Sequence, residues 1–187
     1  MEKTHYSAID FQIRLMTDAD YKKLSAFSCG VNTLDHFFQC EVAECVKRHY
    51  LASYCAFLGS GEIIAIFTLM NDALMISSQT EKEDFIDDLK FEVDDDIITF
   101  FNHQSSYPAI NIGHLGISLD YQNKGIGSAI IDLVADTFAE YRQAGCQFIT
   151  VDALNNPDCI KFYYSNGFFH QTDKDLYSST RRMYRIL

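Results

Sequence analysis

The chain has 187 residues with 48% hydrophobic and 14% aromatic content, and its formal net charge is −11. This length and composition fit one globular domain with a hydrophobic core, so we expect a single domain over residues 1–187. The acidic balance argues against a general nucleic-acid-binding protein, which needs a basic surface, and nucleic acid is not an expected partner. Because no apolar stretch reaches the roughly 18 residues of a membrane-spanning helix, we expect no membrane association either.

The six cysteines form no C-x-x-C pair, and several lie within apolar runs. This usage is typical of reduced, buried thiols, and it predicts a cytoplasmic protein. The N-terminus lacks the apolar segment of a secretory signal, which agrees with that location. No His/Cys cluster has the spacing of a zinc site, so no metal centre is predicted.

The first half of the chain predicts strands, two helices and a hairpin. The expected elements are a strand at Phe11–Met16, a helix opened by Thr17, a second helix opened by Thr33, and strands at Tyr50–Leu58 and Ile63–Met70. Gly59–Glu62, between the last two strands, is typical of a hairpin turn. The second helix has a broad apolar face and is therefore expected to pack on the core.

A strongly acidic stretch follows the hairpin. Between Glu81 and Asp96 there are nine acids and two lysines, which together supply −7 of the net charge. Such a run is typical of a solvated loop or helix. We treat residues 77–109 as a variable segment without an assigned structure.

The second half of the chain alternates strands and helices. The expected elements are strands at Ile112–Leu119, Gln147–Ala153, Phe168–Thr172 and Arg181–Ile186, and helices at Gly125–Arg142 and Pro157–Ser165. Pro157 favours a helix start and Gly167 favours a helix end. This order predicts an α+β fold, with helices over a mixed, largely antiparallel sheet.

One strand–loop–helix segment, Leu115–Ser128, has the composition of a ligand site. Gly125 and Gly127 flank the expected helix start, where glycine lets a ligand approach the main chain closely. Unpaired N–H groups at a helix N-terminus form an anion site without adding net charge, which suits an acidic protein. Lys124 would add a screened surface contact. The spacing matches neither a P-loop nor a Rossmann fingerprint, and two glycines alone also fit a tight strand–helix turn.

Two motifs occur in order in this half: Gln122–Gly127 has the sequence QNKGIG, and Asn156–Phe168 has the sequence NPDCIKFYYSNGF. The first matches the Q/R-x-x-G-x-G/A signature of the GNAT superfamily of acetyl-CoA-dependent N-acetyltransferases. The second resembles that family's N-x-x-A-x-x-F-Y-x-x-x-G-F stretch, with Cys159 in place of the usual alanine. The resemblance covers roughly Ile112–Phe169. It implies the GNAT fold, a sheet with helices on both faces, and acetyl-CoA as the acyl donor.

The resemblance implies a role for each matching residue. The main chain of Leu115 and Ile117 would pair with the pantetheine arm, and Asn156 would contact that arm or cap the following helix. The pyrophosphate would be cradled by Gln122, Asn123, Lys124, Gly125, Ile126, Gly127 and Ser128.

Tyr163 matches the tyrosine that protonates the departing thiolate in many GNAT enzymes. A phenol with a pKa of about 10 stays protonated at neutral pH and can donate its proton as charge develops on sulfur. A core aromatic is the structural alternative, and Tyr164 is the candidate if the alignment is shifted by one residue. His114 is the nearest candidate for a base that deprotonates the amine, and a structural hydrogen-bonding role is its alternative.

The acceptor is less well defined than the donor. Phe27–Phe38 resembles the opening of GNAT-type toxins that acetylate the amine of aminoacyl-tRNA, but such proteins need a basic surface and this chain is acidic. The leading interpretation is therefore acetyl transfer to a primary amine of a small molecule, peptide or protein, and the charge favours a cationic acceptor. A non-catalytic CoA-binding regulatory module is a further alternative, and a homodimer is a candidate assembly.

Overall fold

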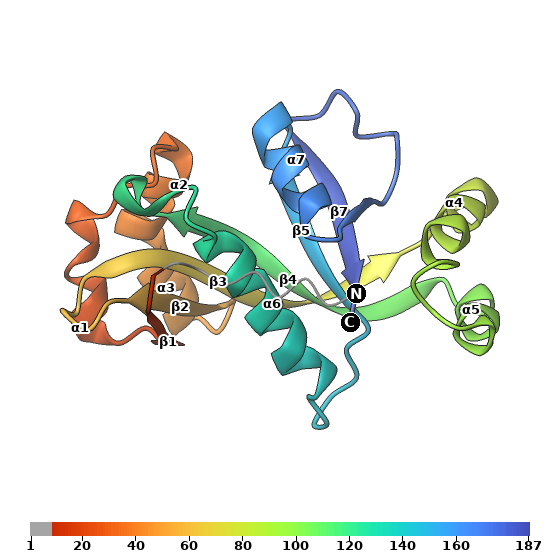
Figure 1. Ribbon diagram of the computed structural model, residues 1–187, viewed down its shortest axis with the longest axis horizontal. Coiled ribbons are helices and arrows are strands. Elements are labelled where there is room, and N and C mark those ends of the chain that lie inside the picture. Colours follow the sequence, from red (N-terminus) through yellow and green to blue (C-terminus); the bar gives the residue numbers. More distant parts are fainter. Residues whose placement is uncertain (1–8) are drawn as a thin grey trace. The chain divides into compact units, whose positions relative to one another are not determined.

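The computed structural model describes residues 9–187, which form two compact units (Figure 1). Unit 1 contains the described residues up to Asn71 together with Ile112–Ala135. Unit 2 contains Asp72–Asn111 together with Asp136–Leu187. Three elements contribute residues to both units: strand β3 (Ile63–Met75), strand β4 (Ser106–Ile117) and helix α6 (Ile126–Ala139).

Unit 1 is built mainly from the N-terminal strands and helices. Besides its parts of β3, β4 and α6, its elements are β1 (Gln12–Leu15), α1 (Asp18–Tyr21), η1 (Leu24–Ala26), α2 (Asn32–His36), η2 (Phe37–Glu41), α3 (Val42–Lys47), β2 (Ala52–Phe57) and η3 (Leu119–Tyr121). α2, the π-helical turn η2 and α3 follow one another without a gap and form one continuous helical run. This run corresponds to the helix expected from Thr33 onward. β1 pairs antiparallel with β2, and β2 pairs antiparallel with β3.

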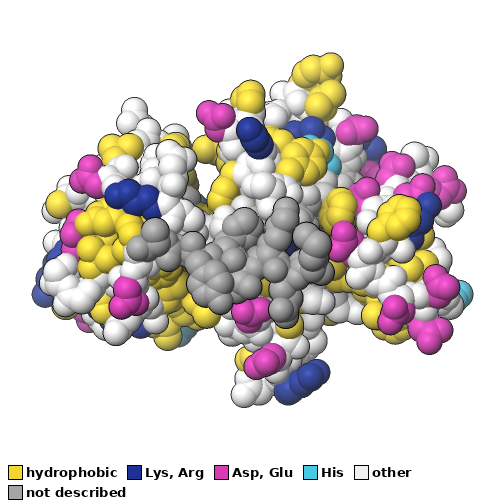
Figure 2. Space-filling model, viewed as in Figure 1, with side chains coloured by type: hydrophobic (Ala, Val, Ile, Leu, Met, Phe, Trp, Pro, Cys, Tyr) yellow, Lys and Arg dark blue, Asp and Glu magenta, His cyan; other side chains and the backbone are white. Residues whose placement is uncertain are grey.

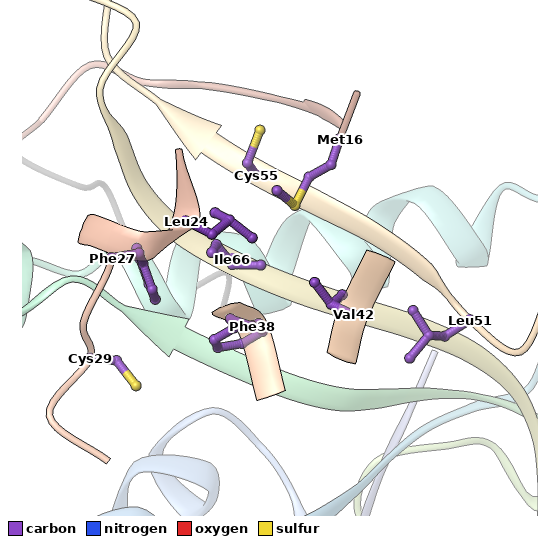
Figure 3. Close-up of a cluster of buried hydrophobic side chains, with 9 residues drawn as sticks. All are labelled: Met16, Leu24, Phe27, Cys29, Phe38, Val42, Leu51, Cys55 and Ile66. Carbon is purple, nitrogen blue, oxygen red and sulfur yellow. The ribbon is translucent and has the colours of Figure 1, made fainter. Parts of the chain in front are cut away.

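The apolar face of this helical run packs into the core of unit 1 (Figure 3). Phe38 and Val42 are each only 1% exposed and join a cluster that includes Ile66 of β3. Full burial of side chains of this size contributes about 1.5–3 kcal/mol each, so this face holds the run in place. Cys29 and Cys55 belong to the same cluster and are buried, whereas Cys40 is exposed and the other three cysteines are partly exposed, so the expectation of buried thiols holds only in part.

Unit 2 contains the acidic segment and the C-terminal half of the chain. Besides its parts of β3, β4 and α6, its elements are α4 (Gln79–Leu89), α5 (Asp95–Asn102), β5 (Phe148–Leu154), α7 (Pro157–Ser165), β6 (Phe169–His170) and β7 (Thr180–Ile186). β5 and β6 each pair antiparallel with β7, whereas β4 and β5 pair in parallel over Ala109–Asn111 and Phe148–Thr150.

The acidic segment is mostly helical. Most of its carboxylates are exposed, and Figure 2 shows acidic side chains gathered over α4 and α5. The opposite side of α4 is apolar: Phe85 is 2% exposed, and its ring lies 5.0 Å from that of Tyr107 and 5.7 Å from that of Phe148. The solvated helix expected here is therefore one face of an amphipathic helix, and the other face belongs to the core of unit 2.

Hydrogen bonding links the strands in the order β1-β2-β3-β4-β5-β7-β6. Apart from the parallel ladder of β4 with β5, the pairings β1–β2, β2–β3, β5–β7 and β6–β7 are antiparallel. The α+β class with a mixed, largely antiparallel sheet is thus confirmed. Among residues 9–187, no helix combines the length and the apolar character that a membrane crossing requires.

Candidate active site

The segment between β4 and α6 contains two residues in the left-handed region of backbone conformation. Asn123 has a φ of 58° and Gly125 a φ of 79°, and Gly125 immediately precedes the helix. The N–H of Ala129 donates to the carbonyl of Gly125 at 3.0 Å, which fixes the first helical hydrogen bond. The preceding amides, of Ile126, Gly127 and Ser128, therefore have no partner within the helix. They lie at the N-terminus of a helix of 14 residues, where such amides are able to receive an anion.

Two side chains of this segment are engaged by the protein itself. The Gln122 Nε2 donates to the carbonyl of Cys29 at 2.8 Å and to that of Ile117 at 3.1 Å. The Lys124 Nζ donates to the carbonyl of Asp120 at 2.6 Å and lies 4.9 Å from the centre of the Tyr121 ring. Both side chains thus hold the shape of the loop from within.

A second segment, Ser28–Gly30, supports the loop, and sequence reasoning did not connect the two. The Leu119 N–H donates to the carbonyl of Ser28 at 3.1 Å. Gly30 has a φ of 80°, and a Cβ on it would lie 2.8 Å from Leu119 Cδ2. The Phe27–Phe38 stretch, which the sequence indicated only through its resemblance to toxins, therefore contacts the loop between β4 and α6 directly.

Asp35 fixes the Ser28–Gly30 segment in turn. One carboxylate oxygen accepts the Ser28 hydroxyl at 2.6 Å, and the other accepts the Cys29 N–H at 2.7 Å. Burial acts to raise the pKa of Asp35, but the hydrogen bonds from Ser28 and Cys29 outweigh it, and the net shift is downward. Asp35 is therefore a carboxylate at neutral pH, and it keeps both hydrogen bonds.

His114 lies in the unit 1 part of β4. Its ring is stacked on that of Phe37, with centroids 3.6 Å apart and an angle of 7°, and its Nδ1 lies 3.0 Å from Thr68 Oγ1. Burial lowers the pKa of His114, partly offset by the charge of Glu41. The neutral imidazole is the dominant form at neutral pH, which fits both the structural and the catalytic interpretation.

The remaining predicted residues lie in unit 2, on α7. Asn156 caps this helix, because its Oδ1 accepts the Cys159 N–H at 2.9 Å, so the capping alternative is confirmed. Tyr163 is 7% exposed, and its ring makes edge contacts with Phe162 at 5.1 Å and Phe168 at 5.2 Å.

The phenol of Tyr163 differs from that of its neighbour in burial. Burial raises the pKa of Tyr163, with a smaller contribution from Cys159. Tyr164 is 50% exposed and lies edge-on against His170. The buried, protonated phenol on α7 is thus the one at the motif position.

The predicted residues therefore fall into two groups. Leu115, Ile117 and Gln122–Ser128 belong to unit 1, whereas Asn156 and Tyr163 belong to unit 2. Within residues 9–187, no group of three or more His, Cys, Asp or Glu side chains could hold a metal ion.

Residues 89–169 match the family model of the acetyltransferase (GNAT) domain. Among solved structures, one similar to this chain is a mutant of the toxin AtaT bound to the C-terminus of the antitoxin AtaR and acetyl-CoA, with 19% identity, a TM-score of 0.68, and coverage of 95% of this chain and 94% of that chain. A mutant of KacT has 18% identity, a TM-score of 0.67, and coverage of 94% of each chain. AtaT complexed with acetyl-methionyl-tRNAfMet has 19% identity, a TM-score of 0.67, and coverage of 92% and 94%. No curated protein matches the chain. The resemblance predicted from the two motifs is confirmed.

Proposed function

We propose that this chain, which carries a GNAT acetyltransferase domain, moves an acetyl group from acetyl-CoA to a primary amine by direct attack of the amine on the thioester. The observation that carries the proposal is the start of α6, where left-handed Asn123 and Gly125 present the amides of Ile126, Gly127 and Ser128 to an anion. Backbone amides bind a pyrophosphate without added charge, which an acidic protein requires.

The rest of the donor site follows from β4. The parallel ladder of β4 with β5 covers only Ala109–Asn111, so Leu115 and Ile117 lie outside it. Their main-chain groups pair with the amide groups of the pantetheine arm. Because Asn156 uses its Oδ1 as a helix cap, its Nδ2 is the side-chain atom left to donate a hydrogen bond to a ligand. Gln122 and Lys124 act indirectly, since their side chains shape the loop that holds the pyrophosphate.

Tyr163 supplies the proton that the leaving thiolate needs. Burial raises its pKa, so the phenol is protonated across the neutral range and is able to donate as the C–S bond breaks. Replacing Tyr163 by Phe removes the donor and keeps the ring. We expect kcat to fall by about 10²- to 10⁴-fold with little change in acetyl-CoA affinity. The matched control is Tyr164→Phe on the exposed side of the same helix, for which we expect wild-type kinetics.

The donor site is tested by calorimetric titration with CoA. Gly125→Glu and Gly127→Glu add bulk and negative charge at the proposed pyrophosphate site, so both variants should lose binding. Gly59→Glu is the control, because a Cβ on Gly59 meets nothing within 4 Å. Unaltered CoA affinity in either α6 variant would remove the basis of the pyrophosphate assignment. CoA binding without acetylation of any amine would favour the non-catalytic regulatory module.

The leading acceptor is an amine of a small molecule, peptide or protein, and the net charge of −11 favours a cationic one. Aminoacyl-tRNA is the second candidate. It is supported by the likeness to AtaT complexed with acetyl-methionyl-tRNAfMet. A comparison of polyamine, aminoglycoside, peptide and aminoacyl-tRNA acceptors with labelled acetyl-CoA distinguishes the two. A homodimer and a cytoplasmic location stay predictions, which light scattering and cell fractionation test.

A further inference from the structure

His114 is held in one orientation by contacts from two elements of unit 1. From η2, Phe37 stacks on the imidazole and Phe38 meets it edge-on, with centroids 6.2 Å apart. From β3, the Thr68 hydroxyl lies 3.0 Å from Nδ1. These contacts leave the Nε2 edge of the ring as its remaining polar position.

The turn that supplies both aromatic rings is unusual. η2 is a π-helical turn, Phe37–Glu41, within the run that extends from Asn32 to Lys47. Such turns are rare and occur frequently at functional sites. Here the turn brings the adjacent rings of Phe37 and Phe38 against the same histidine. The aromatic clamp on His114 is thus a product of the irregular backbone.

The position of His114 on β4 relates it to the proposed donor site. Successive side chains of a strand point to opposite faces, so His114 and Gly116 share the face that meets η2. Gly116 confirms this direction, because a Cβ on it would lie 2.7 Å from Phe38 Cε2. Leu115 lies between them and presents the main chain that we assign to the pantetheine arm, at whose end the thioester is attached.

We infer that His114 is a catalytic residue: its Nε2 takes the proton from the attacking amine. This inference rests on the acetyl transfer proposed above. In the tautomer that this role requires, the neutral ring donates its Nδ1 proton to Thr68 Oγ1, which leaves the lone pair on Nε2. An imidazole that is oriented through its other nitrogen is the usual arrangement of a general base.

The proton balance is complete. The amine nitrogen attacks the carbonyl carbon, a C–N bond forms, and the carbonyl π electrons move to oxygen. The adduct collapses, the C–S bond breaks, the nitrogen gives one proton to His114 Nε2, and the sulfur takes one proton from a general acid. Exchange with solvent then removes the proton from the imidazolium and restores the proton of the acid. The products are the amide and free CoA.

The electrostatic environment favours a base at neutral pH. Burial lowers the pKa of His114, so the ring is neutral above the acidic range. The charged group that faces it from η2 is Glu41, which acts in the opposite direction and lies 3.4 Å from His36 Nε2. From β3 the facing group is the uncharged Thr68.

The experiment measures transfer to the best amine of the acceptor panel at saturating acetyl-CoA. We expect His114→Ala to lower kcat by about 10²- to 10⁴-fold, as for loss of a general base, with CoA affinity retained. Added imidazole should restore part of the rate as its neutral fraction increases with pH. Thr68→Val should give an intermediate loss. His103→Ala, at an exposed histidine, is the control and should behave as the wild type.

A second measurement does not depend on the acceptor. Nitrogen NMR of the folded protein should show His114 neutral at pH 7 with its proton on Nδ1. A proton on Nε2 would overturn the inference, as would a full rate of transfer in His114→Ala. If the wild-type protein acetylates no amine, the proposed function and this inference fail together. If the wild type transfers acetyl groups but added imidazole does not restore the rate of His114→Ala, only the inference on His114 is contradicted.

Discussion

Replacement of Gln122 by Glu tests how strongly the loop between β4 and α6, the proposed cofactor loop, depends on its own internal hydrogen bonds. The change keeps the size of the side chain and replaces the Nε2 donor with an oxygen. That oxygen would face the carbonyls of Cys29 and Ile117, now 2.8 Å and 3.1 Å from Nε2. Two hydrogen bonds are lost, at about 0.5–1.5 kcal/mol each, and at neutral pH a carboxylate charge is brought against two carbonyl oxygens. We expect a loss of about 1–3 kcal/mol in stability.

The same change should appear in cofactor binding. If CoA binds only the wild-type shape of the loop, part of the lost stability must be recovered on binding. Each 1.4 kcal/mol recovered in this way lowers CoA affinity about tenfold. Thermal melting of the apo protein and calorimetric titration with CoA measure the two effects. Gln171→Glu is the matched control, because Gln171 also donates its amide to a carbonyl, that of Met75, at 2.6 Å. It should lower the melting temperature and leave CoA affinity unchanged.

One pattern of results would show that these hydrogen bonds do not shape the loop. Gln122→Glu would melt at the wild-type temperature and bind CoA with the wild-type affinity. In that case the hydrogen bonds to Cys29 and Ile117 do not determine the shape of the loop. A loss of stability with unchanged CoA affinity would show that the shape of this loop does not affect CoA binding.

Two further predictions concern unit 2. The Lys174 ammonium and the hydrogen bonds from Ser77 lower the pKa of Glu81 to about 2, so its contribution to stability is present above the unfolded pKa and is lost as pH falls through about 2. Urea unfolding between pH 6 and pH 2 should therefore show a weaker pH dependence in Glu81→Gln, and an unchanged dependence would contradict this role. Phe85→Ala should cost about 3–5 kcal/mol in unfolding free energy, because it leaves a cavity among packed rings, whereas Phe91→Ala should stay within about 0.5 kcal/mol. Phe91 is 89% exposed, so equal losses in both variants would refute the packing argument.

The sequence predicted best where local signals and the tertiary structure agree. The helix Pro157–Ser165 begins and ends as expected, because a proline suits its first turn and Asn156 caps it. The start of β4 was missed: the sequence predicted Ile112, and the strand begins at Ser106. Pro108 interrupts the local pattern, and the ladder with β5 at Ala109–Asn111 stabilises the strand there. Pairing between distant strands is not visible in a local window.

In the candidate site, too, local features were predicted from the sequence and contacts between distant residues were not. The helix start next to Gly125 was predicted from a short motif, because the turn into α6 depends on local backbone geometry. The bond from Gln122 to Cys29 joins residues 93 positions apart, so neither residue's surroundings in the sequence could indicate it. The aromatic clamp on His114 was missed for a related reason. It depends on a π-helical turn, which has no simple sequence signature.

The division of unit 1 along the chain has a consequence for how such a protein can diversify. The chain leaves unit 1 after Asn71 and returns at Ile112, so the acidic segment is an insertion between two parts of one folding unit. The closure entropy of an insertion increases only with the logarithm of its length, by about 0.6 kcal/mol for each doubling. The exposed turn between α4 and α5 can therefore change in length at little thermodynamic cost, whereas Phe85 and the other buried residues of this segment are constrained by the core of unit 2. Variation in this insertion is thus compatible with an unchanged loop between β4 and α6.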